Sequence, residues 1–133
     1  ICPANADLGW YVDLDAHEKV TGKLALSNET VFVSRYTPNN KNICNPGDSK
    51  LTEHNFACGN KIRETKLGQG IATGAVIHKD KIYVGISGSG SEDIKDEKGN
   101  VIGSRKDNII VLTPKKGAKG IGSVSYESWR EIF

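Results

Sequence analysis

Short runs of β-branched and aromatic residues, separated by turn-forming residues, constrain this chain more than any other feature. Val31 and Val33 flank Phe32, Ile82 and Val84 flank a tyrosine, and residues 109–112 are all apolar. Glycine, asparagine, aspartate and proline separate these runs, and almost no apolar residues recur at helical spacing. The continuous run at 109–112 is typical of a strand buried on both faces. The pattern predicts an all-β fold.

The bulk composition limits the chain to one modest domain. A chain of 133 residues buries roughly two thirds of its unfolded surface. Only 37% of the residues are hydrophobic, and 15 are glycines, so we expect a thin core in a single β domain spanning 1–133. The 18 basic and 16 acidic residues are interspersed, which argues against a nucleic-acid partner. No apolar run reaches the ~20 residues of a membrane-spanning helix.

A weak internal repeat indicates how the strands are grouped. Residues 21–26 lead through a turn at 27–29 to the strand at 31–33, and residues 73–78 lead through a turn at 79–81 to the strand at 82–84. The offset of about 51 residues is close to the roughly 40–50 residues of a β-propeller blade. A third unit of the repeat, before residue 109, is incomplete.

Two or three such units are too few for a ring, because propellers use roughly four to eight blades. The repeat therefore predicts a partial propeller-like set of antiparallel hairpin blades, or a small sandwich, with long polar loops at 37–60 and 87–106. Open blades would leave strand edges unpaired, and unpaired edges invite another chain to cover them. We therefore expect a polypeptide partner.

The three cysteines predict one intramolecular disulfide in an oxidising compartment. Cys44 and Cys58 flank a polar loop, and a disulfide closing it would stabilise the fold by about 3 kcal/mol. Cys2 is then left to pair with another segment or another chain. The alternative is three reduced cysteines in a cytosolic protein. No Cys-x-x-Cys spacing supports zinc or covalent haem.

No residue pattern predicts catalysis, a cofactor or a metal. His17, His54 and His78 each lie in or beside an expected turn, so we expect three surface histidines. The Ser-Gly-Ser-Gly run at 87–90 is similar to a phosphate-cradling loop, but no helix with lysine and serine or threonine follows. A mobile loop is the expectation there, and the chain is predicted not to be an enzyme.

The aromatic residues allow two interpretations. Aromatic rings can stack on sugars, which would make the chain a secreted carbohydrate-binding module. The alternative is packing within and between the sheets, because these residues lie inside alternating strands. The residues concerned are Trp10, Tyr11, Phe32, Tyr36, Tyr83 and Trp129.

Several short motifs occur in an order that indicates a family. A Gly-Trp-Tyr strand, an aromatic strand ending in Tyr-x-Pro, a Cys-Asn-Pro-Gly loop and a closing Ser-Trp-Arg-Glu segment follow one another. This order resembles the C-terminal β-propeller part of the type IV pilus biogenesis and tip-associated adhesin proteins (PilC/PilY). The residues that carry the likeness are Gly9, Trp10, Tyr11, Tyr36, Pro38, Cys44, Gly47, Trp129 and Arg130.

Two segments depart from that family's pattern. Residues 51–56 are more polar than the family's blade strand, which suggests an exposed edge or an altered loop. The resemblance also raises calcium binding, but the acidic segment 92–100 lacks the Asp-x-Asp-x-Asp-Gly spacing of a calcium loop. Calcium is therefore not carried over, and no cofactor is expected.

The resemblance implies a non-enzymatic component of a type IV pilus (a fimbrium), acting in pilus assembly and cell adhesion. Its partners would be other pilus proteins, either a pilin or the remaining propeller segment, within a larger assembly. It would be extracellular and pilus-associated at the cell surface, after transit through the periplasm. An alternative is a structural subunit, the globular surface part of a filament that a separate helical pilin chain completes.

Overall fold

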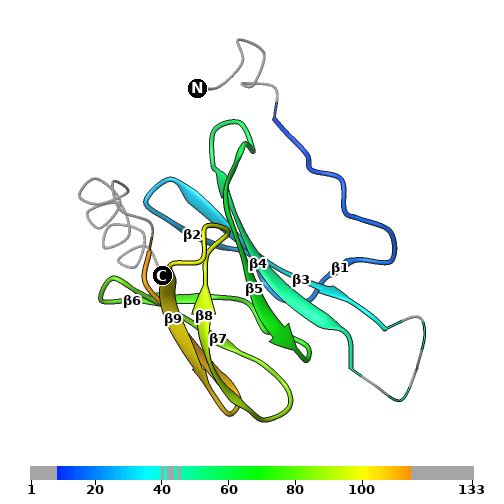
Figure 1. Cartoon of the computed structure of the whole chain (residues 1–133). Helices are drawn as coiled ribbons and strands as arrows, with labels where there is room; N and C mark the ends of the chain where they lie inside the picture. The colour runs from blue at the N-terminus through cyan, green and yellow to red at the C-terminus, as the bar shows by residue number, and fades with distance from the viewer. Residues whose placement is uncertain (1–8, 40, 42–43, 45, 115–133) are drawn as a thin grey trace.

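The computed structural model describes residues 9–39, 41, 44 and 46–114, which form ten strands and no helix. The prediction of an all-β fold is confirmed. The strands make two antiparallel five-stranded sheets, drawn in Figure 1 in blue to green and in green to orange. The first sheet holds β1 (Lys19–Val20), β2 (Ala25–Ser27), β3 (Thr30–Thr37), β4 (Asp48–Asn55) and β5 (Lys61–Gln69). The second sheet holds β6 (Val76–His78), β7 (Lys81–Gly85), β8 (Ser91–Lys95), β9 (Val101–Lys106) and β10 (Ile109–Leu112).

The two sheets differ in strand order. In the first, β3, β4 and β5 follow one another as a meander, and β1 and β2 both pair with β3, at opposite ends of it. In the second, the order is β6-β7-β10-β9-β8. The chain therefore passes from β7 to the far edge and returns through β9, so that β10 lies between strands formed earlier in the chain.

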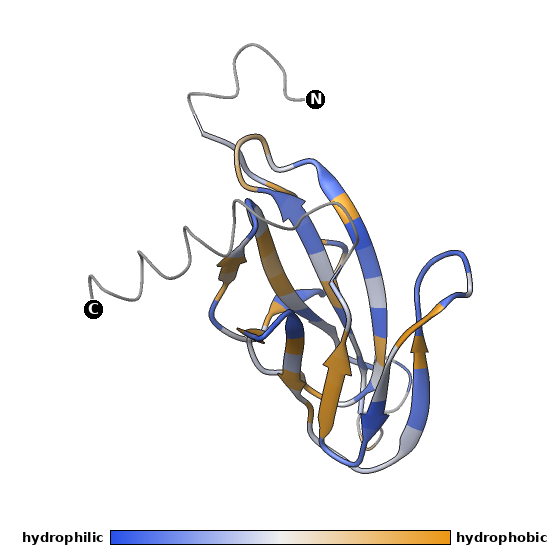
Figure 2. Cartoon of the chain, turned by 90° about the vertical axis from the view of Figure 1, so that its left-hand side faces the viewer, coloured by the Kyte–Doolittle hydropathy of each residue, from blue (hydrophilic) through white to orange (hydrophobic). Residues whose placement is uncertain are grey.

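The core lies between the sheets. Leu51 and Leu67 of the first sheet meet Ile82, Ile110 and Leu112 of the second, and all five are fully buried. Burial of a side chain of this size stabilises a fold by about 1.5–3 kcal/mol. Figure 2 shows the accompanying alternation of hydrophobic and hydrophilic residues along the strands.

Strand β10 corrects one sequence interpretation. The apolar run at 109–112 was expected to be buried on both faces. Ile110 and Leu112 do face the core, but Ile109 is 53% exposed. Its strand has only one covered face, because the sheet packs against a single opposing layer.

The two hairpin turns that the repeat predicted are present. Asn28 and Glu29 join β2 to β3 with φ values of 52° and 60°, and Lys79 and Asp80 join β6 to β7 with φ values of 47° and 63°. Positive φ at both central residues is the type I′ geometry that suits the right-handed twist of a hairpin. Asparagine and aspartate tolerate it, whereas glutamate and lysine are strained there.

The two repeat units occupy equivalent positions in their sheets. The Thr21 N–H donates to the Ser34 carbonyl at 3.0 Å, and the Thr73 N–H donates to the Gly85 carbonyl at 2.8 Å. The units also touch each other, since a Cβ built on Gly22 would lie 2.2 Å from the Gly74 nitrogen. This backbone contact brings β2 against β6, so one pair of sheet rims is closed by glycine packing.

The long polar loops expected at 37–60 and 87–106 are largely wrong. The first region contains β4, which is not an edge but lies between β3 and β5. The second contains β8 and β9. Strand β4 escaped prediction because Leu51 is its only large apolar residue, while Thr52, Glu53 and His54 are buried polar residues.

The propeller arrangement stays a prediction. The strands of the described part form two sheets around a common core, and neither a ring of blades nor a closed barrel is seen among them. No apolar helix of membrane-spanning length occurs in the same part of the chain.

Candidate functional site

The candidate site is a groove where the rim of the first sheet faces the rim of the second. Strands β5 and β8 are the edge strands there, and they lie against each other. A loop cavity of about 590 Å³ lies between the end of β5, residues 87–90 and Arg105, and a strand cavity of about 390 Å³ lies along β5 and β8. Gly68 and Glu92 line both cavities. We call the two together the rim groove.

Charged side chains bridge the two edge strands. The Glu97 carboxylate, beyond β8, accepts a hydrogen bond from the Glu64 N–H of β5 at 3.0 Å. A Cβ on Gly68 would lie 2.8 Å from the Glu92 carboxylate, so β8 side chains reach the β5 backbone. Charges on an edge strand discourage pairing with other chains. The rims that the sequence predicted to be bare are therefore partly covered.

Arg105 of β9 lines the loop cavity and is 5% exposed. Its Nε, Nη1 and Nη2 atoms donate to the carbonyls of Asp107 at 3.0 Å, Gln69 at 2.8 Å and Ser87 at 3.3 Å. The guanidinium thus ties the end of β5 to the 87–90 loop and to the β9–β10 turn. This role is not predictable from the sequence, because an arginine that precedes Lys-Asp-Asn is typical of an exposed turn.

The Ser-Gly-Ser-Gly loop is held at both ends, whereas a mobile loop was expected. The Ser87 hydroxyl accepts a hydrogen bond from the Ile71 N–H at 2.8 Å, and the Gly90 carbonyl accepts one from the Asp107 N–H at 2.6 Å. Gly88 and Gly90 have φ values of 97° and 147°, which a side-chain-bearing residue rarely adopts. The loop therefore forms a fixed wall of the cavity.

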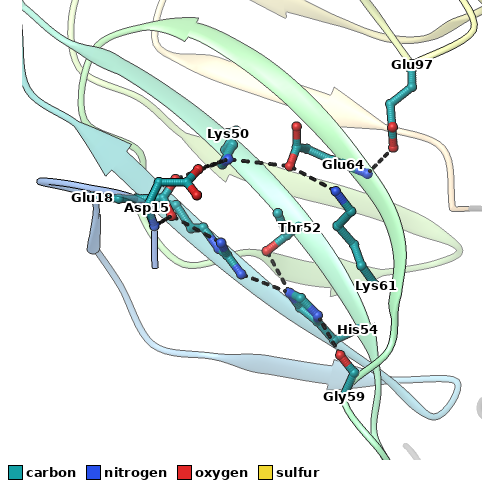
Figure 3. A network of polar contacts seen from close by, with 10 residues as sticks. Asp15, Glu18, Lys50, Thr52, His54, Gly59, Lys61, Glu64 and Glu97 are labelled. Atoms are coloured by element: carbon teal, nitrogen blue, oxygen red, sulfur yellow. Dashed lines mark hydrogen bonds and ion pairs between the residues drawn. The ribbon is translucent and has the colours of Figure 1, made fainter. Parts of the chain in front are cut away.

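A second polar cluster lies on the outer face of the first sheet (Figure 3). Arg35 pairs with the Glu18 carboxylate at 3.1 Å, and both residues are buried. His54 is 2% exposed, so its expected place on the surface is wrong. His17 and His78 are exposed, as expected.

The His54 ring is held on both nitrogens. Nδ1 donates to the Gly59 carbonyl at 3.0 Å, while Nε2 lies 3.0 Å from the Thr52 hydroxyl and 3.2 Å from Arg35 Nη2. A guanidinium can only donate, so Nε2 is the acceptor and the ring is neutral. Burial lowers the pKa of His54, and the Arg35 and Lys61 charges lower it further against the effect of the Gly59 bond.

Lys50 connects the buried part of this cluster to carboxylates that are more exposed. Its ammonium group lies 3.2 Å from carboxylate oxygens of Asp15 and Glu18 and 3.4 Å from Glu64. Burial lowers the pKa of Lys50, but the hydrogen bonds to Glu18 and Asp15 outweigh it and the pKa is raised. For Glu64, burial alone would raise the pKa. The charges of Lys50 and Lys61 outweigh the effect of burial, and the pKa of Glu64 is therefore lowered. Glu64 lines the strand cavity, but His54, Arg35 and Glu18 line neither cavity, so we interpret the buried part of the cluster as structural.

The aromatic residues do not gather into one platform. Trp10 stacks on the His54 ring with centroids 6.1 Å apart and donates to the Phe56 carbonyl at 2.7 Å. Tyr11 is 86% exposed, Phe32 belongs to the core and Tyr83 is half-buried. Trp129 and Arg130 lie outside the described residues. Nothing in these positions favours sugar stacking.

Three of the family-motif residues do come together. The Gly47 N–H donates to the Tyr36 hydroxyl at 2.9 Å, and a Cβ on Gly47 would lie 2.7 Å from the Pro38 backbone. They form the connection between β3 and β4, at the opposite end of the sheet from Trp10. Gly9, which precedes Trp10 in the chain, is exposed. Tyr36, Pro38 and Gly47 thus shape the first sheet.

The cysteine pairing stays a prediction. Cys44 is exposed in the connection between β3 and β4, and Cys58 lies in the turn between β4 and β5. Cys2, expected to pair with another segment or chain, lies outside the described residues.

The acidic segment 92–100 forms β8 and a tight turn. The Asp96 carboxylate accepts hydrogen bonds from the N–H groups of Lys98 and Asn100, each at 2.9 Å. In the part of the chain that the structure describes, no group of three histidine, cysteine, aspartate or glutamate side chains is placed to hold a metal ion.

The comparisons with known proteins found no family model, no curated protein and no solved structure that matches this chain.

Proposed function

We propose that the chain is a non-enzymatic binding module of a type IV pilus assembly, and that the rim groove is where it receives its ligand or partner. One observation carries the proposal. Three segments far apart in the sequence, the end of β5, the 87–90 loop and β9, place polar groups around one cavity of about 590 Å³. Ligand pockets are concave and hold a few precisely placed polar groups on a rigid scaffold.

The position of the groove supports a partner of extended shape. Strands β5 and β8 each have a hydrogen-bonded neighbour on one side only. A polypeptide that lies along such a rim can use main-chain hydrogen bonds for affinity and neighbouring side-chain pockets for specificity. The strand cavity continues from the loop cavity along both strands, which gives such a segment a path.

The pilus setting is supported by the order of motifs described above. The predicted disulfide would also fit the oxidising environment in which such proteins mature and act. The resemblance to the tip-associated adhesins supports a role in assembly and attachment at the cell surface.

The filament-subunit alternative has an observation of its own. Leu26 on β2 and Val76 on β6 are 48% and 61% exposed, and these two strands lie side by side at the rims opposite the groove. Exposed apolar residues on neighbouring strands favour contact with another chain. In that case a helical pilin would cover the β2–β6 side rather than occupy the rim groove.

A groove-filling variant tests the proposal. Ser89 is exposed on the groove wall, and Ser89→Trp places a bulky ring across the loop cavity without disturbing the core. Lys19→Trp is the matched control, because Lys19 is equally exposed but lies on β1, at the other edge of the first sheet. Each variant replaces the chromosomal gene in the source organism.

Surface pili are then counted by electron microscopy, and attachment to host cells is measured at equal protein level. We expect Ser89→Trp to reduce both several-fold and Lys19→Trp to change neither. Normal piliation and attachment with Ser89→Trp would overturn the groove as the functional site. Loss in the Lys19→Trp strain alone would instead favour a surface on the first sheet.

A further inference from the structure

We propose that the loop cavity of the rim groove is an oxyanion subsite, which takes a carboxylate or phosphate group of the ligand between Arg105 and the 87–90 loop. This inference deepens the proposed function and rests on the same groove. It assigns a charge to the ligand, which the groove shape alone does not.

The charge of Arg105 is the first argument. The structure describes three buried arginines, and two of them have carboxylate partners: Arg35 pairs with Glu18, and Arg63 pairs with Glu53. Arg105 is as deeply buried, yet the three acceptors of its hydrogen bonds are all neutral carbonyl oxygens. No carboxylate lies within ion-pair distance of it among the described residues. Buried charges are ordinarily paired, but Arg105 has no described carboxylate in direct contact with it, although Glu92 and Asp48 line the same cavity.

The remaining donors of Arg105 are the second argument. A guanidinium carries five N–H groups in a planar fork that matches carboxylate and phosphate oxygens. Three of the five donate to the carbonyls of Asp107, Gln69 and Ser87. These bonds fix the orientation of the side chain and leave two N–H groups over. A ligand oxyanion can therefore bind a guanidinium that is already ordered, with little further loss of side-chain entropy.

The 87–90 loop supplies the third argument. A Cβ on Gly88 would lie 3.4 Å from Arg105 Nη2, so the loop backbone passes close to the guanidinium. The backbone N–H groups of Gly88 and Ser89 have no hydrogen-bond acceptor within the described part of the chain. Successive N–H groups in a glycine-rich loop form an anion-binding concavity. The Ser89 hydroxyl, exposed on the same wall, adds another donor.

Two carboxylates limit the affinity and give the proposal a sharp test. Glu92 and Asp48 also line the loop cavity, and Glu92 is the register partner of Arg105 on the neighbouring strand. Both would repel a bound oxyanion. Neutralising Glu92 should therefore tighten binding, by about threefold for a nearby solvent-screened unit charge. A cavity that binds no anion predicts no such gain.

The experiment is a nuclear magnetic resonance titration of the folded chain at constant ionic strength. Sodium phosphate and sodium acetate are added separately, in exchange for sodium chloride, and the backbone amide shifts are recorded. We expect saturable shifts at Gly88, Ser89 and Gly90 with at least one of the two anions. Saturation with phosphate alone assigns a phosphorylated ligand, and saturation with acetate alone assigns a carboxylate ligand.

Charge variants with isosteric controls complete the test. We expect Ser89→Glu to bind at least threefold more weakly than Ser89→Gln, because the two side chains differ only in charge. Glu92→Gln should tighten binding about threefold. Lys106→Gln, which removes an exposed charge from the same strand as Arg105, should change it less than twofold. Arg105→Gln should abolish binding, but the surface variants carry the test if that protein fails to fold.

Non-saturating shifts with both anions, or a Glu92→Gln variant that binds no more tightly than the wild type, would overturn the subsite. Failure of the oxyanion subsite can be distinguished from failure of the proposed function. If Ser89→Trp abolishes piliation and neither anion binds, the groove stands and its ligand is neutral. If an anion binds at the loop and Ser89→Trp is silent in the cell, the subsite stands and the pilus function falls.

Discussion

Acidification should destabilise this fold through one buried histidine. In the folded state the His54 ring is neutral, because Arg35 Nη2 donates to its Nε2 atom. A proton on Nε2 would set two donors against each other in a site that water does not reach. Burial is the largest cause of the lowered pKa, and the charges of Arg35 and Lys61 add to it.

The sign of the effect follows from linkage. The unfolded chain takes up a proton on His54 near pH 6.5, whereas the folded chain does so only at a lower pH. Between these two pH values the unfolded state binds more protons, so the free energy of unfolding falls as pH falls. One proton limits the slope to about 1.4 kcal/mol per pH unit. Above pH 6.5 the contribution of His54 is fully present and constant.

Urea denaturation at half-unit steps from pH 8 to pH 5 measures this slope. We expect a fall in the free energy of unfolding below pH 6.5, and a much smaller fall in His54→Gln, whose amide can still donate to Gly59 and accept from Arg35. The exposed His17 and His78 provide the controls His17→Gln and His78→Gln, which should keep the wild-type slope. Equal slopes in the wild type and in His54→Gln between pH 6.5 and pH 5.5 would refute the reasoning.

Two further predictions concern backbone geometry. Gly22→Ala should lower the free energy of unfolding by at least about 3 kcal/mol, because the new methyl would lie 2.2 Å from the Gly74 nitrogen. Gly85→Ala is the milder control, because its methyl would meet only the Thr73 side chain, at 3.2 Å. Equal losses in the two variants would contradict the close backbone contact between Gly22 and Gly74. Replacing Lys79-Asp80 by Asn-Gly should stabilise the fold by about 1 kcal/mol, because both positions have positive φ. Thermal denaturation measures this gain in stability, and a lowered melting temperature would exclude the type I′ turn.

The sequence predicted the strands that carry apolar runs and the turns between them. Residues 31–33, 82–84 and 109–112 all lie in strands, and the turns at 28–29 and 79–80 lie where their asparagine and aspartate indicated. These signals are local: alternation along a strand and tolerance of positive φ depend on a few neighbouring residues. Local signals therefore sufficed for the all-β class.

Strand β4 shows where local signals fail. Its buried residues include Glu53 and His54, which read as surface residues in any short window. They are acceptable inside the fold because Arg63 neutralises the glutamate and because Gly59, Thr52 and Arg35 satisfy the histidine. Thr52 lies on β4 itself, but Arg63, Arg35 and Gly59 come from other strands and a turn, so only the tertiary structure could supply them.

The candidate site had one visible component. The Ser-Gly-Ser-Gly run at 87–90 is similar to a phosphate-binding loop, but the sequence lacks the following helix that would support that interpretation. The cation beneath it, Arg105, and the β5 wall that it contacts at Gln69 lie 15 or more residues away in the chain. Strand order brings them together, and neither spacing nor composition encodes strand order.

The strand order of the second sheet also bears on how the protein is made. Strand β10 pairs with both β7 and β9, yet it leaves the ribosome after every other described strand. Until then Ile82 and Val84 lack the neighbour that completes their sheet, and the Leu51 and Leu67 side chains lack part of their cover. Nascent chains in that interval expose apolar surface and unpaired edges, which makes them prone to aggregate. A chaperone that shields the first sheet during synthesis would protect the chain in that interval.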